Sequence, residues 1–152
     1  MPHVSVIMGS QSDEPVVNET VAVLEQMEVD YEVRVMSAHR TPEKVREYVL
    51  DAVERGVEVF IAAAGGAAAL PGVIASWTTR PVIGVPLASS ELKGLDALMA
   101  VAQMPPGVPV ACVAVGSWGA RNAAFLAAQI LGLKYDSIKD AYEKYRQQLR
   151  ER

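Results

Sequence analysis

Val4-Ser5-Val6-Ile7-Met8-Gly9-Ser10-Gln11-Ser12-Asp13 is the stretch that decides the fold, because an apolar run, a glycine and a polar loop follow one another. The run 4–8 is typical of a short buried strand. Apolar residues then recur at helical spacing over 14–28, and Pro15 stands in the first turn, where a missing N–H costs little. The segment therefore predicts a strand, a turn and a helix, in that order.

The same alternation continues along the chain. Further strands are predicted at 31–36, 57–62, 81–85 and 108–115, and helices at 42–55, 67–77 or 70–77, 92–102 and 122–131. Strands and helices that alternate with short connections require parallel strands covered by helices on both faces. We therefore expect an α/β fold, a three-layer αβα sandwich with a flavodoxin-like or Rossmann-like parallel sheet.

The C-terminal segment has a different character. Its other faces are charged, but its apolar residues recur at helical spacing. These apolar residues are Ile138, Ala141, Tyr142, Tyr145 and Leu149. We expect a single α/β domain over 1–133 and an extra amphipathic helix over 134–152. This helix belongs either to the same domain or to a subunit interface.

Composition narrows the class of protein. The net charge of the 152 residues is −4, which argues against a general nucleic-acid binder. No apolar run reaches the ~18 residues of a membrane span, and the N-terminus shows no charged leader, so we expect a cytoplasmic protein. The mean hydropathy of +0.17 favours a homo-oligomer with apolar surface between subunits. Two histidines and the single Cys112 predict no metal site.

The loops that follow the strands should carry the chemistry, because ligands of parallel sheets bind beyond the carboxyl ends of the strands. In the first loop, Gly9 permits close backbone approach, and the hydroxyl of Ser10 and the free N–H groups of the helix start attract a phosphate. The carboxylate of Asp13 would repel a phosphate and suits ribose hydroxyls. An ordinary capped helix start explains these residues equally well.

The second loop, 37–42, is rich in polar groups and contains Ser37, His39 and Arg40. Arginine can bind phosphate oxygens with two N–H groups, and histidine exchanges a proton near neutral pH. His3 is the only other histidine, so His39 is the candidate acid or base. The competing interpretation is a histidine that is merely solvated or caps the helix.

The third loop, 63–72, is small and apolar, so a flat ring could lie directly on its backbone. Tight packing of a helix on the sheet favours the same residue types. We expect Trp77 and Trp118 to serve packing or a subunit interface, and Cys112 to lie inert in a core strand.

Taken together, these segments resemble one family. The matching motifs are Met8–Asp13, Ser37–Pro42, Ala64–Ala68, Leu70–Gly72, Pro81–Pro86, Gln103–Pro105, Gly107–Pro109, Asn122–Ala124 and Ile130–Leu131. They resemble the PurE-type enzymes of purine biosynthesis, the N5-carboxyaminoimidazole ribonucleotide mutases, over about residues 3 to 133. The segments around Arg40 and Gln103–Pro105 favour the bacterial mutase class over the animal-type carboxylases, which carry a lysine in place of this arginine.

The resemblance implies a function and a set of roles. The chain would interconvert N5-carboxyaminoimidazole ribonucleotide and 4-carboxy-5-aminoimidazole ribonucleotide, with CO2 as a trapped intermediate and without a cofactor or metal. His39 would be the general acid/base. The residues that would bind the substrate are Ser10 and Asp13 at the ribose phosphate, Arg40 and Ser37 at the phosphate, and Ala64, Gly65, Gly66 and Leu70 around the ring and carboxylate. Members of the family are homo-octamers.

One position departs from the family pattern. Ala69 stands where the bacterial class has a second histidine, and Ala63 replaces a usual glycine. The animal-type class also lacks that histidine, so the alternatives are a carboxylase that uses free CO2 and a variant, natural or engineered, impaired by the missing imidazole. From other classes, a flavodoxin-like module that only binds FMN or a nucleotide and a carboxylase of cofactor biosynthesis share parts of the pattern.

Overall fold

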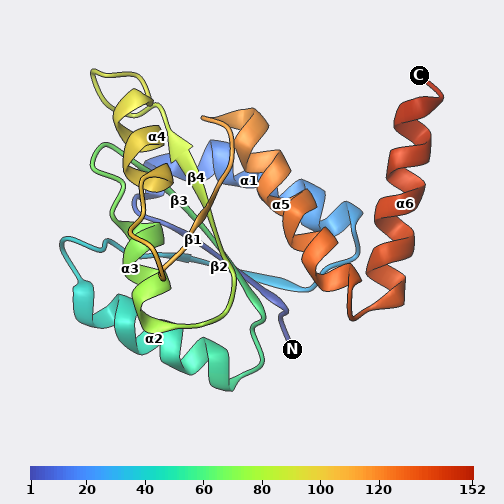
Figure 1. Ribbon diagram of the computed structural model, residues 1–152, viewed down its shortest axis with the longest axis horizontal. Helices are drawn as coiled ribbons and strands as arrows, with labels where there is room; N and C mark the ends of the chain where they lie inside the picture. Colours follow the sequence, from blue (N-terminus) through green and yellow to red (C-terminus); the bar gives the residue numbers. More distant parts are fainter.

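A parallel five-stranded sheet forms the centre of the computed structural model, which describes residues 1–152. Its strands are β1 (Val4–Met8), β2 (Tyr31–Val35), β3 (Val59–Gly65), β4 (Val82–Leu87) and β5 (Ala111–Cys112). The spatial order is β2-β1-β3-β4-β5, and Figure 1 labels the first four of these strands. This is the flavodoxin-like order, in which the chain reverses its direction of winding at β1 and β3. The predicted fold class is confirmed.

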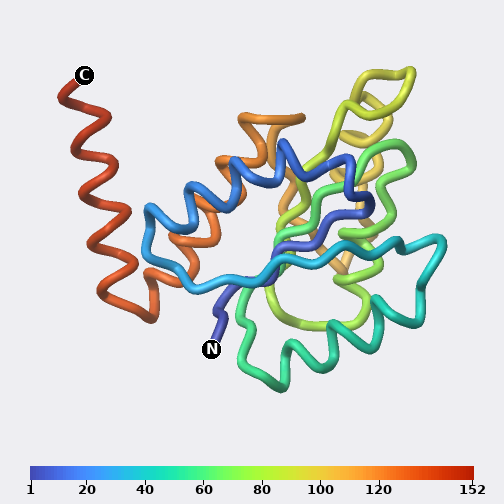
Figure 2. The backbone as a smooth tube through the Cα atoms, turned by 180° about the vertical axis from the view of Figure 1, so that it is seen from behind, coloured from blue at the N-terminus to red at the C-terminus, as the bar shows by residue number.

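Helices cover both faces of the sheet. They are α1 (Glu14–Gln26), α2 (Pro42–Glu54), α3 (Leu70–Trp77), α4 (Leu95–Ala102), α5 (Ser117–Gly132) and α6 (Asp136–Arg150). Helices α1 and α5 lie side by side on one face, and α2, α3 and α4 lie on the other (Figures 1 and 2).

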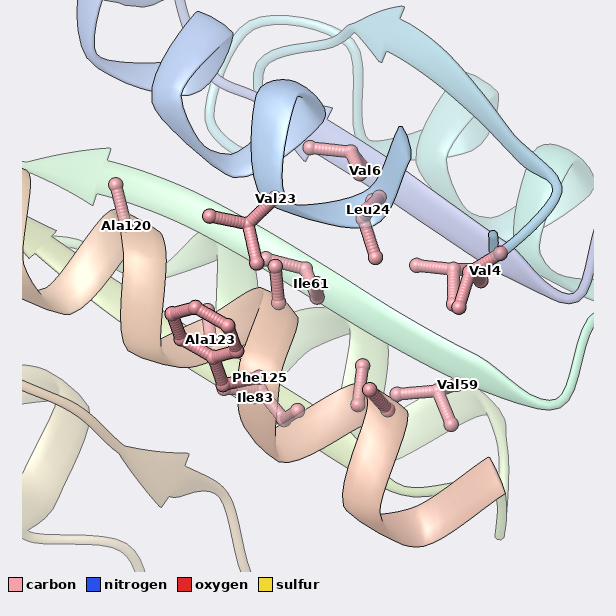
Figure 3. Close-up of a cluster of buried hydrophobic side chains, with 14 of the residues drawn as sticks. Val4, Val6, Val23, Leu24, Val59, Ile61, Ile83, Ala120, Ala123 and Phe125 are labelled. Atoms are coloured by element: carbon pink, nitrogen blue, oxygen red, sulfur yellow. The ribbon is translucent and has the colours of Figure 1, made fainter. Parts of the chain in front are cut away.

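Alternating side chains of the strands separate two cores. Val6 and Ile61 point toward α1 and α5, where they contact Val23 and other apolar residues of these helices (Figure 3). Their sequence neighbours Ile7 and Phe60 belong to the core under α2, α3 and α4. Because successive strand residues point to opposite faces, the runs that read as uniformly apolar supply both cores.

The last helix, α6, packs on α5 through aromatic residues. Tyr145 stacks on Phe125 with ring centroids 4.5 Å apart, and Tyr142 lies 5.8 Å from the same ring. At the α5–α6 turn, Glu58 accepts hydrogen bonds from Tyr135 and from Lys134 (3.2 Å). Burial alone would raise the pKa of Glu58, but these bonds outweigh it and hold the pKa below its usual value.

Three local features differ from the sequence prediction. A short 3-10 helix occupies Gln11–Asp13 within the expected loop. Helix α5 begins at Ser117, five residues before the expected start at 122. Strand β5 has only two residues where eight were expected, because Pro109 lacks a donor for the ladder and only Ala111 and Cys112 pair with β4. Cys112 is therefore half-buried at the sheet edge and not in the core.

Neither a membrane span nor a metal cluster occurs in the structure. Every helix is too short or too polar to cross a bilayer. Nowhere do three or more histidine, cysteine, aspartate or glutamate side chains gather in a way that could hold a metal ion.

Candidate active site

A cavity of about 350 Å³ opens at the carboxyl ends of β1 to β4. Its lining comes from four separate loops: Gly9, Ser10, Ser12 and Asp13; Ser37, Ala38, His39 and Arg40; Ala64, Gly65, Ala68, Ala69 and Leu70; and Ser89. Parallel strands bring their carboxyl ends to one edge, so these distant segments meet there. A wider hollow of about 1100 Å³, between Trp77 and Pro109, contains none of the predicted site residues.

The loop after β1 is held by its own serines. Ser10 caps the 3-10 helix: its Oγ accepts from the backbone N–H of Ser12 (3.3 Å) and lies 2.8 Å from the Ser12 hydroxyl. Asp13, at the end of this 3-10 helix, is only 8% exposed. Burial raises the pKa of Asp13 above its usual value, and a backbone hydrogen bond from Ser10 opposes this shift only in part. Asp13 therefore places a largely buried carboxyl group in the wall of the cavity.

The loop after β2 presents two cationic or ionisable side chains to the cavity. Ser37 folds the loop back on itself, since its Oγ accepts from the N–H of Arg40 (3.1 Å) and its carbonyl accepts from the N–H of Thr41 (2.9 Å). His39 and Arg40 are left exposed at the tip. Neither side chain forms a hydrogen bond or ion pair within the chain, so both are free to meet a ligand.

The loop after β3 contributes only small or apolar residues to the cavity wall. Gly66 takes a φ of +60° and Ala68 a φ of +44°, and the N–H of Ala68 donates to the carbonyl of Gly65 (3.0 Å). The turn places Ala68 and Leu70, both buried, against the cavity. A left-handed conformation is costly for alanine, and backbone strain of this kind is common at functional sites.

Eight of the nine predicted site residues line this one cavity: Ser10, Asp13, Ser37, His39, Arg40, Ala64, Gly65 and Leu70. Gly66 does not line it, although it forms the turn behind Gly65. Ser89 was not predicted. Its position just beyond the carboxyl end of β4 is the signal that could have singled it out.

The chain is similar to known proteins over nearly its whole length. The AIR carboxylase family model matches residues 3–152. The chain is 57% identical over 150 residues to the N5-carboxyaminoimidazole ribonucleotide mutase of Pyrococcus abyssi. This alignment covers 99% of this chain and 85% of the relative. The chain is 52% identical to the enzyme of that name from Thermotoga maritima, over 99% of this chain and 86% of the relative.

A solved structure shows the same fold. The crystal structure of Treponema denticola PurE superposes with a TM-score of 0.88 at 29% identity, over 99% of this chain and 93% of that one. The sequence matches and the superposition each extend over nearly the whole length of the chain. The chain therefore belongs to the AIR carboxylase family.

Proposed function

We propose that this protein interconverts N5-carboxyaminoimidazole ribonucleotide and 4-carboxy-5-aminoimidazole ribonucleotide in purine biosynthesis. The observation that carries the proposal is one cavity that unites an unpaired arginine, an unpaired histidine and a wall of small and apolar residues around Gly65. The names of relatives that share more than half of its residues favour this reaction over a carboxylase that uses free CO2.

The nucleotide lies across the cavity with its phosphate at the second loop. Arg40 binds the phosphate with its free guanidinium, with Ser37 beside it. Ser10 contacts the ribose phosphate from the first loop, and Asp13 accepts from the ribose hydroxyls. The aminoimidazole ring rests on Ala64 and Gly65, where a methyl group and a hydrogen atom let a flat ring approach the backbone.

The reaction moves one carboxylate and one proton. The bond between the exocyclic nitrogen and the carboxylate breaks, CO2 leaves, and the nitrogen gains a proton. The electron-rich C4 of the ring then attacks the trapped CO2, and loss of the C4 proton restores aromaticity. His39 exchanges the proton at both stages, because the substrate is held in one orientation beside it. Apolar walls keep the CO2 next to the ring.

The assembly is a cytoplasmic homo-octamer in this proposal. His39 and Arg40 are exposed in a single chain, so neighbouring subunits are needed to exclude water from the cavity. Exposed apolar side chains such as Trp77, Met99 and Trp118 give these subunits a surface to pack on. The 1–133 region acts as one domain, and α6 extends from it toward a subunit contact.

The decisive experiment follows carboxylate transfer with and without added bicarbonate. The purified protein is incubated with N5-carboxyaminoimidazole ribonucleotide, and formation of the C4-carboxylated product is measured. Transfer at the same rate in both conditions is expected for a mutase. A strict requirement for bicarbonate would identify a carboxylase instead, and absence of any product would contradict both functions.

His39→Asn tests the proton transfer itself. Asparagine keeps the polar shape but cannot exchange a proton, so we expect turnover to fall at least 100-fold with substrate affinity largely unchanged. His3→Asn, which changes the other histidine at the far end of β1, is the matched control and should retain activity. Near-normal turnover of the His39→Asn protein would refute the assignment.

A further inference from the structure

Ser89 is the only hydrogen-bonding side chain in the wall of the cavity that the β3 and β4 loops form. The other lining residues from these two loops are Ala64, Gly65, Ala68, Ala69 and Leu70, which offer only backbone polar groups. The polar side chains of the cavity otherwise all come from the loops after β1 and β2. An anionic group bound at this wall therefore has one side-chain donor within its own wall.

The hydroxyl of Ser89 lies directly over Gly65. A Cβ atom at position 65 would stand 1.7 Å from the Ser89 Oγ, so only glycine leaves room for the hydroxyl. Ser89 forms no hydrogen bond within the chain, whereas its neighbour Ser90 donates to Asp96 (2.5 Å) and accepts from the N–H of Leu92 (3.2 Å). Ser90 thus holds the loop, and Ser89 is left with a free hydroxyl at the cavity.

We propose that Ser89 is a substrate-binding residue whose hydroxyl donates to the migrating carboxylate. The inference rests on the proposed function, because that function places the ring on Ala64 and Gly65 and its carboxylate at this wall. Both nucleotides carry an anionic carboxylate there, and a hydrogen bond to a charged group is worth more than one between neutral groups. Ala69 lines the same wall and has no polar side-chain atom, so Ser89 alone can make this contact from a side chain of that wall.

A comparison of two product-like nucleotides tests the contact. Calorimetry measures the affinity of the protein for 4-carboxy-5-aminoimidazole ribonucleotide and for aminoimidazole ribonucleotide, which lacks the carboxylate. In Ser89→Ala we expect about tenfold weaker binding of the carboxylated nucleotide, the loss typical of one charged hydrogen bond. Binding of the decarboxylated nucleotide should change less than about twofold.

Two further variants separate a contact from a structural effect. Ser89→Thr keeps a hydroxyl and should restore most of the lost affinity. Ser90→Ala removes the loop-holding hydroxyl next door and should not change the ratio of the two affinities. Equal weakening for both nucleotides in Ser89→Ala, or no weakening at all, overturns the proposal.

The same measurements separate this inference from the proposed function. A wild-type protein that binds both nucleotides but transfers no carboxylate contradicts the function, while the ratio of affinities still decides whether Ser89 contacts the carboxylate. A wild-type protein that binds neither nucleotide overturns both.

Discussion

The guanidinium of Arg40 forms no ion pair within the chain. Its effect on ligand binding can therefore be measured separately from its effect on stability. We expect Arg40→Ala to raise the KM for the nucleotide about 30-fold, because a charged hydrogen-bonded contact with phosphate is lost, and to leave the Tm within about 1 °C. Steady-state kinetics and thermal unfolding measure the two effects.

The conservative Arg40→Lys variant serves as the control. It keeps the charge but loses the two-pronged geometry of the guanidinium, so its KM should fall between those of wild type and Arg40→Ala. A large drop in Tm for Arg40→Ala would show that the side chain supports the fold and not the ligand.

Asp13 is largely buried, and we propose that its carboxylate binds the ribose hydroxyls of the substrate. Its pKa is higher in the folded protein than the usual value of 3.8, so the folded state binds the proton more tightly than the unfolded chain does. Stability therefore falls as pH rises through the window above 3.8. Asp13→Asn lacks this loss, and we expect its stability relative to wild type to increase between pH 4 and pH 7, with about tenfold weaker nucleotide binding.

Urea unfolding of both proteins at several pH values checks the linkage. The free energy of unfolding of Asp13→Asn should increase relative to that of wild type as the pH rises. A constant difference, or one that shrinks over this range, would show that the carboxylate is not penalised by its burial.

At the scale of elements, one glycine fixes how α5 meets the sheet. A Cβ at Gly119 would stand 1.6 Å from the carbonyl oxygen of Ala114, which is backbone and cannot move aside easily. We expect Gly119→Ala to destabilise the protein by about 3 kcal/mol or more, despite the better helix propensity of alanine. Chemical denaturation measures this.

Gly72 is a matched control, because it also occupies the third position of its helix, α3. Its added Cβ would meet only the flexible side chain of Met104, at 3.2 Å. Gly72→Ala should therefore be within about 1 kcal/mol of wild type. Equal effects at both positions would contradict the close approach at Gly119.

Sequence patterns fail at two elements, the start of α5 and the length of β5. Periodicity located the first four strands and every helix, because buried apolar faces dominate these elements. It missed the first turn of α5, since Gly116 and Gly119 are typical of a loop. Glycine stands at 119 because a Cβ there would meet the backbone of Ala114, and periodicity does not register such a close approach. It overextended β5, whose length depends on pairing with β4 and not on β propensity.

The candidate site was more predictable than the elements around it. A strand end followed by serine, histidine or arginine is a local signal, and parallel topology then gathers such loops at one edge. Ser89 carries no local signal beyond its position, because its place in the site comes from the close approach of its hydroxyl to Gly65, a residue of another loop. Close approaches between loops require coordinates.

At the scale of the whole molecule, the exposed apolar surface predicts the assembly. Leu95 and Met99 stand one turn apart on α4 and are 54% and 61% exposed. Exposed apolar side chains on one helix face are typical of a subunit interface. We expect the double variant Leu95→Glu and Met99→Glu to dissociate the proposed octamer of eight 16.3 kDa chains into smaller species.

Analytical ultracentrifugation measures the mass, and the apolar exchange Leu95→Met with Met99→Leu is the control that should keep it unchanged. Dissociation should also lower turnover, because an isolated chain leaves His39 and Arg40 open to solvent and lets CO2 escape from the cavity. A glutamate variant that keeps the octameric mass would place the interface elsewhere. A dissociated variant with full turnover would show that the cavity needs no neighbour to retain CO2.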